Sequence, residues 1–219
     1  MSQDTTLLDG LDPDLSSRLA SRRDLFRKAS VKLGAAATAP LILAAVSSEA
    51  VGQGLPAQVV DILNFALTLE YLESDFYRAA AATPGLIPPQ FAQVLTAISR
   101  DEDAHVNLLL MTLGSAAIPK PQFDLTGRGR YPDILSNFNT TAKVAQTLED
   151  TGVAAYKGQA PKLTGGGDLL TTALRIHSVE ARHAAELRRL RGVRSWDGAF
   201  DRPLTKAQVL ARARPFIVG

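Results

Sequence analysis

Two stretches of the sequence, Asp-Glu-Asp-Ala-His at residues 101–105 and Val-Glu-Ala-Arg-His at residues 179–183, determine the fold. Each contains a Glu-x-x-His pair, and residues three apart lie on one face of an α-helix. The apolar seams around the pairs contain Phe91, Leu95, Ile98, Glu102, His105 and Leu109, and Leu169, Ala173, Ile176, Glu180, His183, Leu187 and Leu190. Because these seams should face a core, the pattern predicts two helices with ionisable side chains at the centre of their buried faces.

Two further helical patterns place a glutamate at the middle of the seam. Their seams contain Val59, Leu63, Ala66, Glu70, Glu73 and Tyr77, and Phe138, Ala142, Ala145, Glu149, Gly152 and Tyr156. In each, a tyrosine follows the first glutamate by seven residues, which is two helical turns. Glu102 follows Glu70 by 32 residues and Glu180 follows Glu149 by 31, so the two halves repeat as a duplicated helical hairpin would.

The four patterns cover roughly residues 56–81, 88–114, 133–157 and 168–191, with Pro- and Gly-rich connections between them. The connections within each pair are short, whereas the proline-rich segment 118–132 joins the pairs. The sequence therefore predicts an all-α four-helix bundle with one long crossover between two helical hairpins. A short C-terminal helix is expected from Thr205, with Gln208 completing a capping box, to Pro215. No strand of useful length is expected.

Buried carboxylates cost several kcal/mol each unless positive charge lies among them. Four glutamates and two histidines that meet at mid-bundle therefore indicate metal cations, and oxygen ligands with two imidazoles suit iron or manganese. One Glu from each of two helices plus Glu-x-x-His from two others is the ligand set of di-iron and di-manganese bundles. The predicted ligands for two Fe or Mn ions are Glu70, Glu102, His105, Glu149, Glu180 and His183.

The composition excludes several alternative chemistries. The 219 residues (23.4 kDa) contain no cysteine, which excludes disulfides, thiolate zinc sites, thiol catalysis and iron–sulfur clusters. A net charge of +2 is too balanced for a dedicated nucleic-acid binder. Oxygen and nitrogen ligands remain, together with hydroxyl groups.

The first 50 residues have the layout of a secretory signal. A basic patch at 22–28 precedes an uncharged apolar stretch at 33–46, which is too short for a convincing membrane span. Ser21-Arg22-Arg23 resembles the twin-arginine signal S-R-R-x-F-L-K, although Leu25 and Phe26 are exchanged and Arg27 replaces Lys. We expect export to the periplasm or beyond, with cleavage near residue 50 and the bundle domain at 51–219. An amphipathic N-terminal helix is the alternative, and an uncleaved signal would tether the protein to a membrane.

Four segments carry a family resemblance: residues 63–73 (LNFALTLEYLE), 101–105 (DEDAH), 149–156 (EDTGVAAY) and 179–184 (VEARHA). Together with the C-terminal stretch 202–217, they resemble the ferritin-like superfamily, in the branch that contains desiccation-related proteins. The resemblance covers about residues 57–217 and implies a ferritin-like bundle with a dimetal site. It implies little about the reaction.

Four other residues have two interpretations each. Glu73 lies opposite Gly152 in the repeat, so it could reach the metals as an extra carboxylate or simply bond to a neighbour. Tyr77 and Tyr156 could hydrogen-bond the ligand carboxylates or supply an electron during oxidation, and a core tyrosine often only satisfies its hydroxyl. A third histidine, His177, is expected to be a partly buried residue rather than a ligand.

Two classes of function remain open. The first is an exported oxidoreductase of ferroxidase or catalase type, with dioxygen or peroxide as substrate, that acts in oxidative or desiccation stress. The alternative is a non-enzymatic protein in which metals stabilise the bundle or iron is sequestered. An open coordination position distinguishes the two, because structural sites are closed. Homo-oligomerisation is possible.

Overall fold

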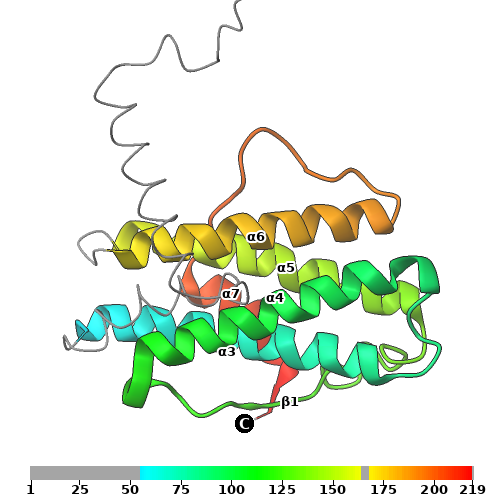
Figure 1. The fold of residues 1–219 in the computed structure, drawn as a ribbon, viewed down its shortest axis with the longest axis horizontal. Coiled ribbons are helices and arrows are strands. Elements are labelled where there is room, and N and C mark those ends of the chain that lie inside the picture. Colours follow the sequence, from blue (N-terminus) through cyan, green and yellow to red (C-terminus); the bar gives the residue numbers. More distant parts are fainter. Residues whose placement is uncertain (1–54, 164–167, 219) are drawn as a thin grey trace, which may run out of the picture. The chain divides into compact units, whose positions relative to one another are not determined.

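The computed structural model describes residues 55–163 and 168–218, and within these ranges five α-helices make up most of the chain (Figure 1). They are α3 (Ala57–Ala82), α4 (Pro89–Leu113), α5 (Phe138–Gln159), α6 (Asp168–Leu190) and α7 (Lys206–Ala213). Helix α3 packs along α4, and α5 packs along α6, while α3 also contacts α5. The predicted all-α bundle of two hairpins with one long crossover and a short C-terminal helix is therefore confirmed. The predicted export segment 1–50 lies outside the described residues.

The helix ends follow the sequence signals closely. Pro89 occupies the first turn of α4, where the backbone N–H has no partner within the helix, so proline loses no hydrogen bond there. Gly114 ends the helix with φ 53°. Thr205 caps α7 through the predicted capping box with Gln208. Each end is set by local backbone chemistry, which explains why the sequence predicted it.

Helix α5 begins at Phe138, five residues later than the sequence predicted. The carboxylate of Asp133 accepts hydrogen bonds from Asn137 Nδ2 at 2.8 Å and Thr140 Oγ1 at 2.9 Å. The side chain of Asn137 in turn accepts from the N–H of Asn139 and caps the helix. These side-chain bonds hold 133–137 in a turn that the helical pattern had concealed.

A small sheet is present, and its strands are too short to conflict with the expectation that no strand of useful length would form. The two-residue strands β1 (Gln122–Phe123) and β2 (Ile217–Val218) pair antiparallel, with Gln122 opposite Val218. Strands this short contain no measurable alternation in the sequence. The pair joins the long crossover to the C-terminal end of the described chain (Figure 1).

The C-terminal segment packs on α5 at a glycine. The N–H of Leu204 donates to the carbonyl of Ala154 at 3.0 Å, and a Cβ built on Gly158 would lie 1.9 Å from the Leu204 carbonyl oxygen. Only glycine permits this approach of two backbones. The segment then places Val209 and Phe216 in the same apolar core as α3 and α5. Among the described residues, no helix is long and apolar enough to cross a membrane.

Candidate metal centre

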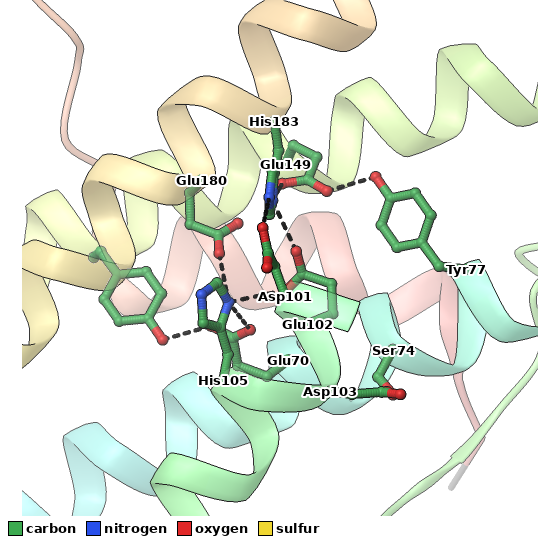
Figure 2. Close-up of polar contacts among 11 residues, drawn as sticks. Glu70, Ser74, Tyr77, Asp101, Glu102, Asp103, His105, Glu149, Glu180 and His183 are labelled. Carbon is green, nitrogen blue, oxygen red and sulfur yellow. Dashed lines mark hydrogen bonds and ion pairs between the residues drawn. The ribbon is translucent and has the colours of Figure 1, made fainter. Parts of the chain in front are cut away.

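The six predicted ligand side chains come together at the middle of the bundle (Figure 2). Helices α3 and α5 each provide one glutamate, and α4 and α6 each provide a Glu-x-x-His pair. All four glutamates are 0% exposed, and the two histidines are 7% and 6% exposed. The residues that could hold metal ions are Glu70, Glu102, His105, Glu149, Glu180 and His183. Each helix is apolar around its ligand, so burial of the seam carries the carboxylates inward.

One group of possible ligand atoms surrounds His105. Its Nδ1 lies 3.2 Å from Glu70 Oε2, 3.2 Å from Glu102 Oε2 and 3.0 Å from Glu180 Oε1. One ring nitrogen carries at most one proton, so it donates to only one of these oxygens at a time. Three carboxylates therefore converge on a single nitrogen, far more acceptors than hydrogen bonding requires.

A second group surrounds His183 and comprises Glu102, Glu149, Glu180 and this histidine. The Nδ1 atom of His183 lies 2.8 Å from Glu102 Oε1 and 3.3 Å from Glu149 Oε2. Glu102 and Glu180 are members of both groups, whereas Glu70 belongs to the first and Glu149 to the second. Two adjacent sites with two shared carboxylates result.

The spacing of these atoms suits metal coordination. Within each group the ligand atoms all lie within 4.8 Å of one another. Bonds of about 2.1 Å at right angles place neighbouring ligand atoms about 3.0 Å apart. The N–O separations between 2.8 and 3.3 Å match that value. The side chains of each group are therefore close enough together to hold one ion between them.

Several buried atoms in the cluster also lack a hydrogen-bond partner among the described residues. They are Glu70 Oε2, Glu102 Oε1, Glu149 Oε2, both carboxylate oxygens of Glu180 and His183 Nδ1. Unpaired buried carboxylate oxygens are costly, and a cation between them would satisfy all of them at once. The residues present therefore fit metal ions, because both the set of donor atoms and the unpaired buried oxygens suit a cation.

The electrostatics of the cluster show the same need for positive charge. Burial disfavours the charged imidazolium, yet the surrounding carboxylates raise the pKa of His105 well above its ordinary value and that of His183 to about 11. Burial, followed by repulsion from neighbouring carboxylates, raises the pKa of Glu102 to about 7 and those of Glu73 and Glu180 well above the ordinary range. Protons therefore supply the compensating charge when metals are absent.

The two core tyrosines hydrogen-bond the ligand carboxylates across the bundle. Tyr77 Oη on α3 donates to Glu149 Oε1 on α5 at 2.5 Å, and Tyr156 Oη on α5 donates to Glu70 Oε1 on α3 at 2.5 Å. Each tyrosine thus contacts the glutamate of the other helix rather than its own. In both glutamates the other oxygen, Oε2, faces a histidine. The hydroxyls fix which oxygen of each glutamate points into the cluster.

Glu73 lies beside the cluster but belongs to neither ligand group found among the described residues. It is 2% exposed, and its Oε2 has no hydrogen-bond partner within the described chain. A Cβ built on Gly152 would lie 3.4 Å from Glu73 Oε1 and 3.0 Å from Glu180 Oε2. The absent side chain at position 152 therefore leaves room mainly for Glu180, since Glu73 would meet a Cβ there at an ordinary contact distance.

One contact of the site was not predicted from the sequence. The outer nitrogen Nε2 of His183 lies 3.2 Å from Asp101 Oδ2, across from α6 to α4 (Figure 2). A carboxylate on the second nitrogen orients a ligating imidazole and fixes its tautomer. Asp101 precedes Glu102 in the sequence, but its side chain is 53% exposed, so no core pattern marked it. His177 lies outside both groups, and its pKa is lowered, mainly by burial.

The fold and this cluster define the class: a four-helix bundle with a buried carboxylate–histidine centre that could hold metal ions. Comparison with known families agrees, because the model of the ferritin-like domain matches residues 58–193. The match covers more than half of the chain, and the protein belongs to the ferritin-like domain family. No curated protein matches this sequence.

Proposed function

We propose that the protein binds two iron or manganese ions in the central cluster and is an oxidoreductase that reacts with dioxygen or peroxide. The observation that carries the proposal is the pair of ligand groups with two shared glutamates. Glu102 and Glu180, which belong to both groups, would be shared by the two ions. Glu70 and His105 complete one site, and Glu149 and His183 complete the other.

The charge of the cluster supports a pair of divalent ions. Four buried carboxylates carry four negative charges, which two divalent cations neutralise, with both histidines neutral. Six protein side chains leave positions for a small oxygen species on two ions that prefer about six ligands each. When bound, the metal pair supplies a redox centre and a template for that species.

We propose Glu73 as the extra carboxylate of this centre. A fifth negative charge next to the bridging Glu180 would offset the additional positive charge of one oxidised ion. Its counterpart in the other half of the repeat is Gly152, so the extra charge lies on one side of the centre only. Such asymmetry favours redox chemistry over a purely structural role.

Tyr77 and Tyr156 are proposed to orient Glu149 and Glu70, as their hydrogen bonds indicate. A second role, in which either tyrosine supplies an electron during oxidation, would give a tyrosyl radical. Freeze-quenched electron paramagnetic resonance of the reduced protein mixed with dioxygen tests that role. Loss of the signal in the corresponding Phe variant would identify the residue.

The biological setting of the proposal comes from the sequence. The twin-arginine-like segment supports export in a folded, metal-loaded state to the periplasm or outside the cell. The resemblance to desiccation-related proteins supports a role in oxidative or desiccation stress. The expected partner is a small oxygen species rather than nucleic acid, with membrane contact only through an uncleaved signal. Homo-oligomers are part of the proposal, and a solution mass tests them.

Elemental analysis of the protein purified without chelator tests the function, beside Glu180→Ala/His183→Ala. We expect about two iron or manganese ions per chain, lost in the variant, and consumption of dioxygen or peroxide by the loaded protein. His177→Ala is the matched control, because this histidine lies outside both ligand groups. Bound metals without any reaction would favour the structural or iron-sequestering alternative. A folded protein that takes up neither metal would refute the metal site.

A further inference from the structure

The connection between α6 and α7 gathers exposed apolar side chains in one short stretch. Val193, Trp196 and Phe200 are 47%, 67% and 90% exposed, and they lie within eight residues. The other exposed large apolar side chains of the described residues lie singly on α4, α6 and β2. Single exposed apolar residues are ordinary on a protein surface, whereas a group of them marks a contact surface.

This connection protrudes from the bundle as a loop. Residues 191–205 contain no helix or strand, and Figure 1 shows them arching away from α6. Gly198 lies midway between Trp196 and Phe200, and a Cβ built on it would meet no atom within 4 Å. A rigid partner would need a matching pocket for such a protruding tip, whereas a fluid bilayer adapts to it. The shape therefore favours a lipid surface.

The acidic residues of the loop are matched by cations of the bundle. Asp197 Oδ2 lies 3.5 Å from Arg188 Nη2 on α6. Asp201 Oδ2 lies 3.5 Å from Lys157 Nζ on α5. Because both carboxylates have a positive partner, they do not cancel the remaining charges of the loop.

Two arginines of the loop have no counter-charge. Arg194 lies two residues before Trp196, and Arg202 lies two residues after Phe200. Both arginines are exposed, and neither side chain has a hydrogen bond or ion pair within the part of the chain that the structure describes. Guanidinium groups bind phosphate through two parallel hydrogen bonds. The loop thus presents unpaired positive charge on either side of its aromatic residues, which complements an anionic surface.

We propose that the loop 193–202 docks on a bilayer that contains anionic lipid. Trp196 and Phe200 enter the interfacial region, where aromatic side chains are favoured. Arg194 and Arg202 bind the lipid phosphates and are attracted by the negative surface potential. The sequence alone predicted membrane contact only through an uncleaved signal, and this loop provides a second one. The contact is independent of the proposed redox function, since it needs no metal.

Tryptophan fluorescence of the full chain tests the proposal. The chain contains one tryptophan, so the emission reports on this loop alone. The titrants are vesicles of phosphatidylcholine and vesicles of equal parts phosphatidylcholine and phosphatidylglycerol. With the anionic vesicles we expect a blue shift of the emission, quenching by brominated acyl chains, and reversal by added salt. A vesicle contact made by the N-terminal segment alone would leave Trp196 in water and its emission unchanged.

A charge variant tests the role of the two arginines. Arg194→Gln/Arg202→Gln should weaken binding to the anionic vesicles, by about fivefold for each charge removed. Arg175→Gln/Arg182→Gln removes the same charge from exposed positions on α6 and is the matched control. It should have a much smaller effect.

An apolar variant tests insertion of the aromatic tip. Phe200→Ser should weaken binding by about tenfold, because the ring no longer leaves water. This side chain is 90% exposed, so the folded bundle should be retained, and circular dichroism checks this. Leu174→Ser, at a 48% exposed position on α6, is the control and should bind as the unaltered protein does.

Three results would overturn the proposal. The first is an unchanged Trp196 emission with anionic vesicles, and the second is equal binding to both kinds of vesicle. The third is a blue shift that follows protein concentration without vesicles, which would assign the loop to a contact between two copies of the chain. All three use the unaltered protein. None of them depends on bound metal, so this proposal and the redox function fail separately.

Discussion

The hydroxyl of Tyr77 donates a 2.5 Å hydrogen bond to Glu149, although these residues are 72 positions apart and on different helices. The same bond recurs in reverse between Tyr156 and Glu70. The paired bonds follow from the duplicated hairpin, since each half contributes one tyrosine and one glutamate at the same spacing. They tie α3 to α5 at the centre of the bundle and orient two ligand carboxylates.

Removal of either hydroxyl should weaken metal binding. In Tyr77→Phe, Glu149 Oε1 loses its donor and the carboxylate is free to rotate away from the cluster. Loss of such outer contacts costs about 10- to 100-fold in metal affinity. Competition titration with a chelator measures this change, and Tyr131→Phe, which removes a hydroxyl from a ring stacked on Phe216, is the control. Equal affinities in both variants would argue against the orienting role.

Glutamates shared by both ligand groups should differ from unshared ones in metal stoichiometry. Glu102→Ala removes a ligand from both groups, so both ions should be lost or greatly weakened. Glu70→Ala removes a ligand from one group only, so about one ion per chain should remain. Metal content after gel filtration measures the difference. The same stoichiometry in both variants would contradict the bridging assignment.

Gly152→Ala should separate stability from metal affinity. A methyl group there would lie 3.0 Å from Glu180 Oε2, so this carboxylate must shift. We expect about tenfold weaker metal binding. Alanine also favours the helix by about 1 kcal/mol, so the metal-free protein should be as stable as before or more so. Urea unfolding and chelator competition measure the two quantities, and parallel losses in both would instead indicate a packing defect.

The metal-free protein should lose stability as the pH rises. In the folded state burial raises the pKa of Glu102 from 4.5 to about 7, and neighbouring carboxylates raise that of His183 from 6.5 to about 11. Between about pH 5 and pH 9 the folded state therefore binds more protons than the unfolded state. Unfolding releases these protons, so the free energy of unfolding falls as the pH rises.

Urea midpoints of chelator-treated protein between about pH 5 and pH 9 measure this slope. Metal-loaded protein should show a flatter or opposite slope, because ligands bind metal in their deprotonated form. A metal-free midpoint that rises over this range would contradict the assignment of protons to the cluster.

Gly158→Ala should disrupt the C-terminal segment. The added Cβ would overlap the Leu204 carbonyl oxygen, which is backbone and cannot rotate away. We expect the free energy of unfolding to fall by about 2 kcal/mol or more. Gly198→Ala, where a Cβ meets no atom within 4 Å, should have little effect in the same thermal or urea melt.

The sequence by itself determined the helices and the candidate metal ligands, because both depend on local spacing. Residues three and four apart share a helix face, so the apolar seams and the two Glu-x-x-His pairs could be recognised without knowledge of the partner helices. The capping box at Thr205 was equally local. The predicted start of α5 at Asp133 was wrong. Side-chain hydrogen bonds within 133–140 form a turn there, although the apolar spacing is that of a helix.

Only the tertiary structure decided how the helices meet. In the folded chain Glu102 and Glu180 belong to both ligand groups, and each core tyrosine donates to the glutamate of the other helix. The exposed Asp101 lies within hydrogen-bond distance of His183. These relationships link different helices, so they depend on the rotation and offset of each helix against the next. The packing of whole seams sets both, and no single stretch of sequence encodes them.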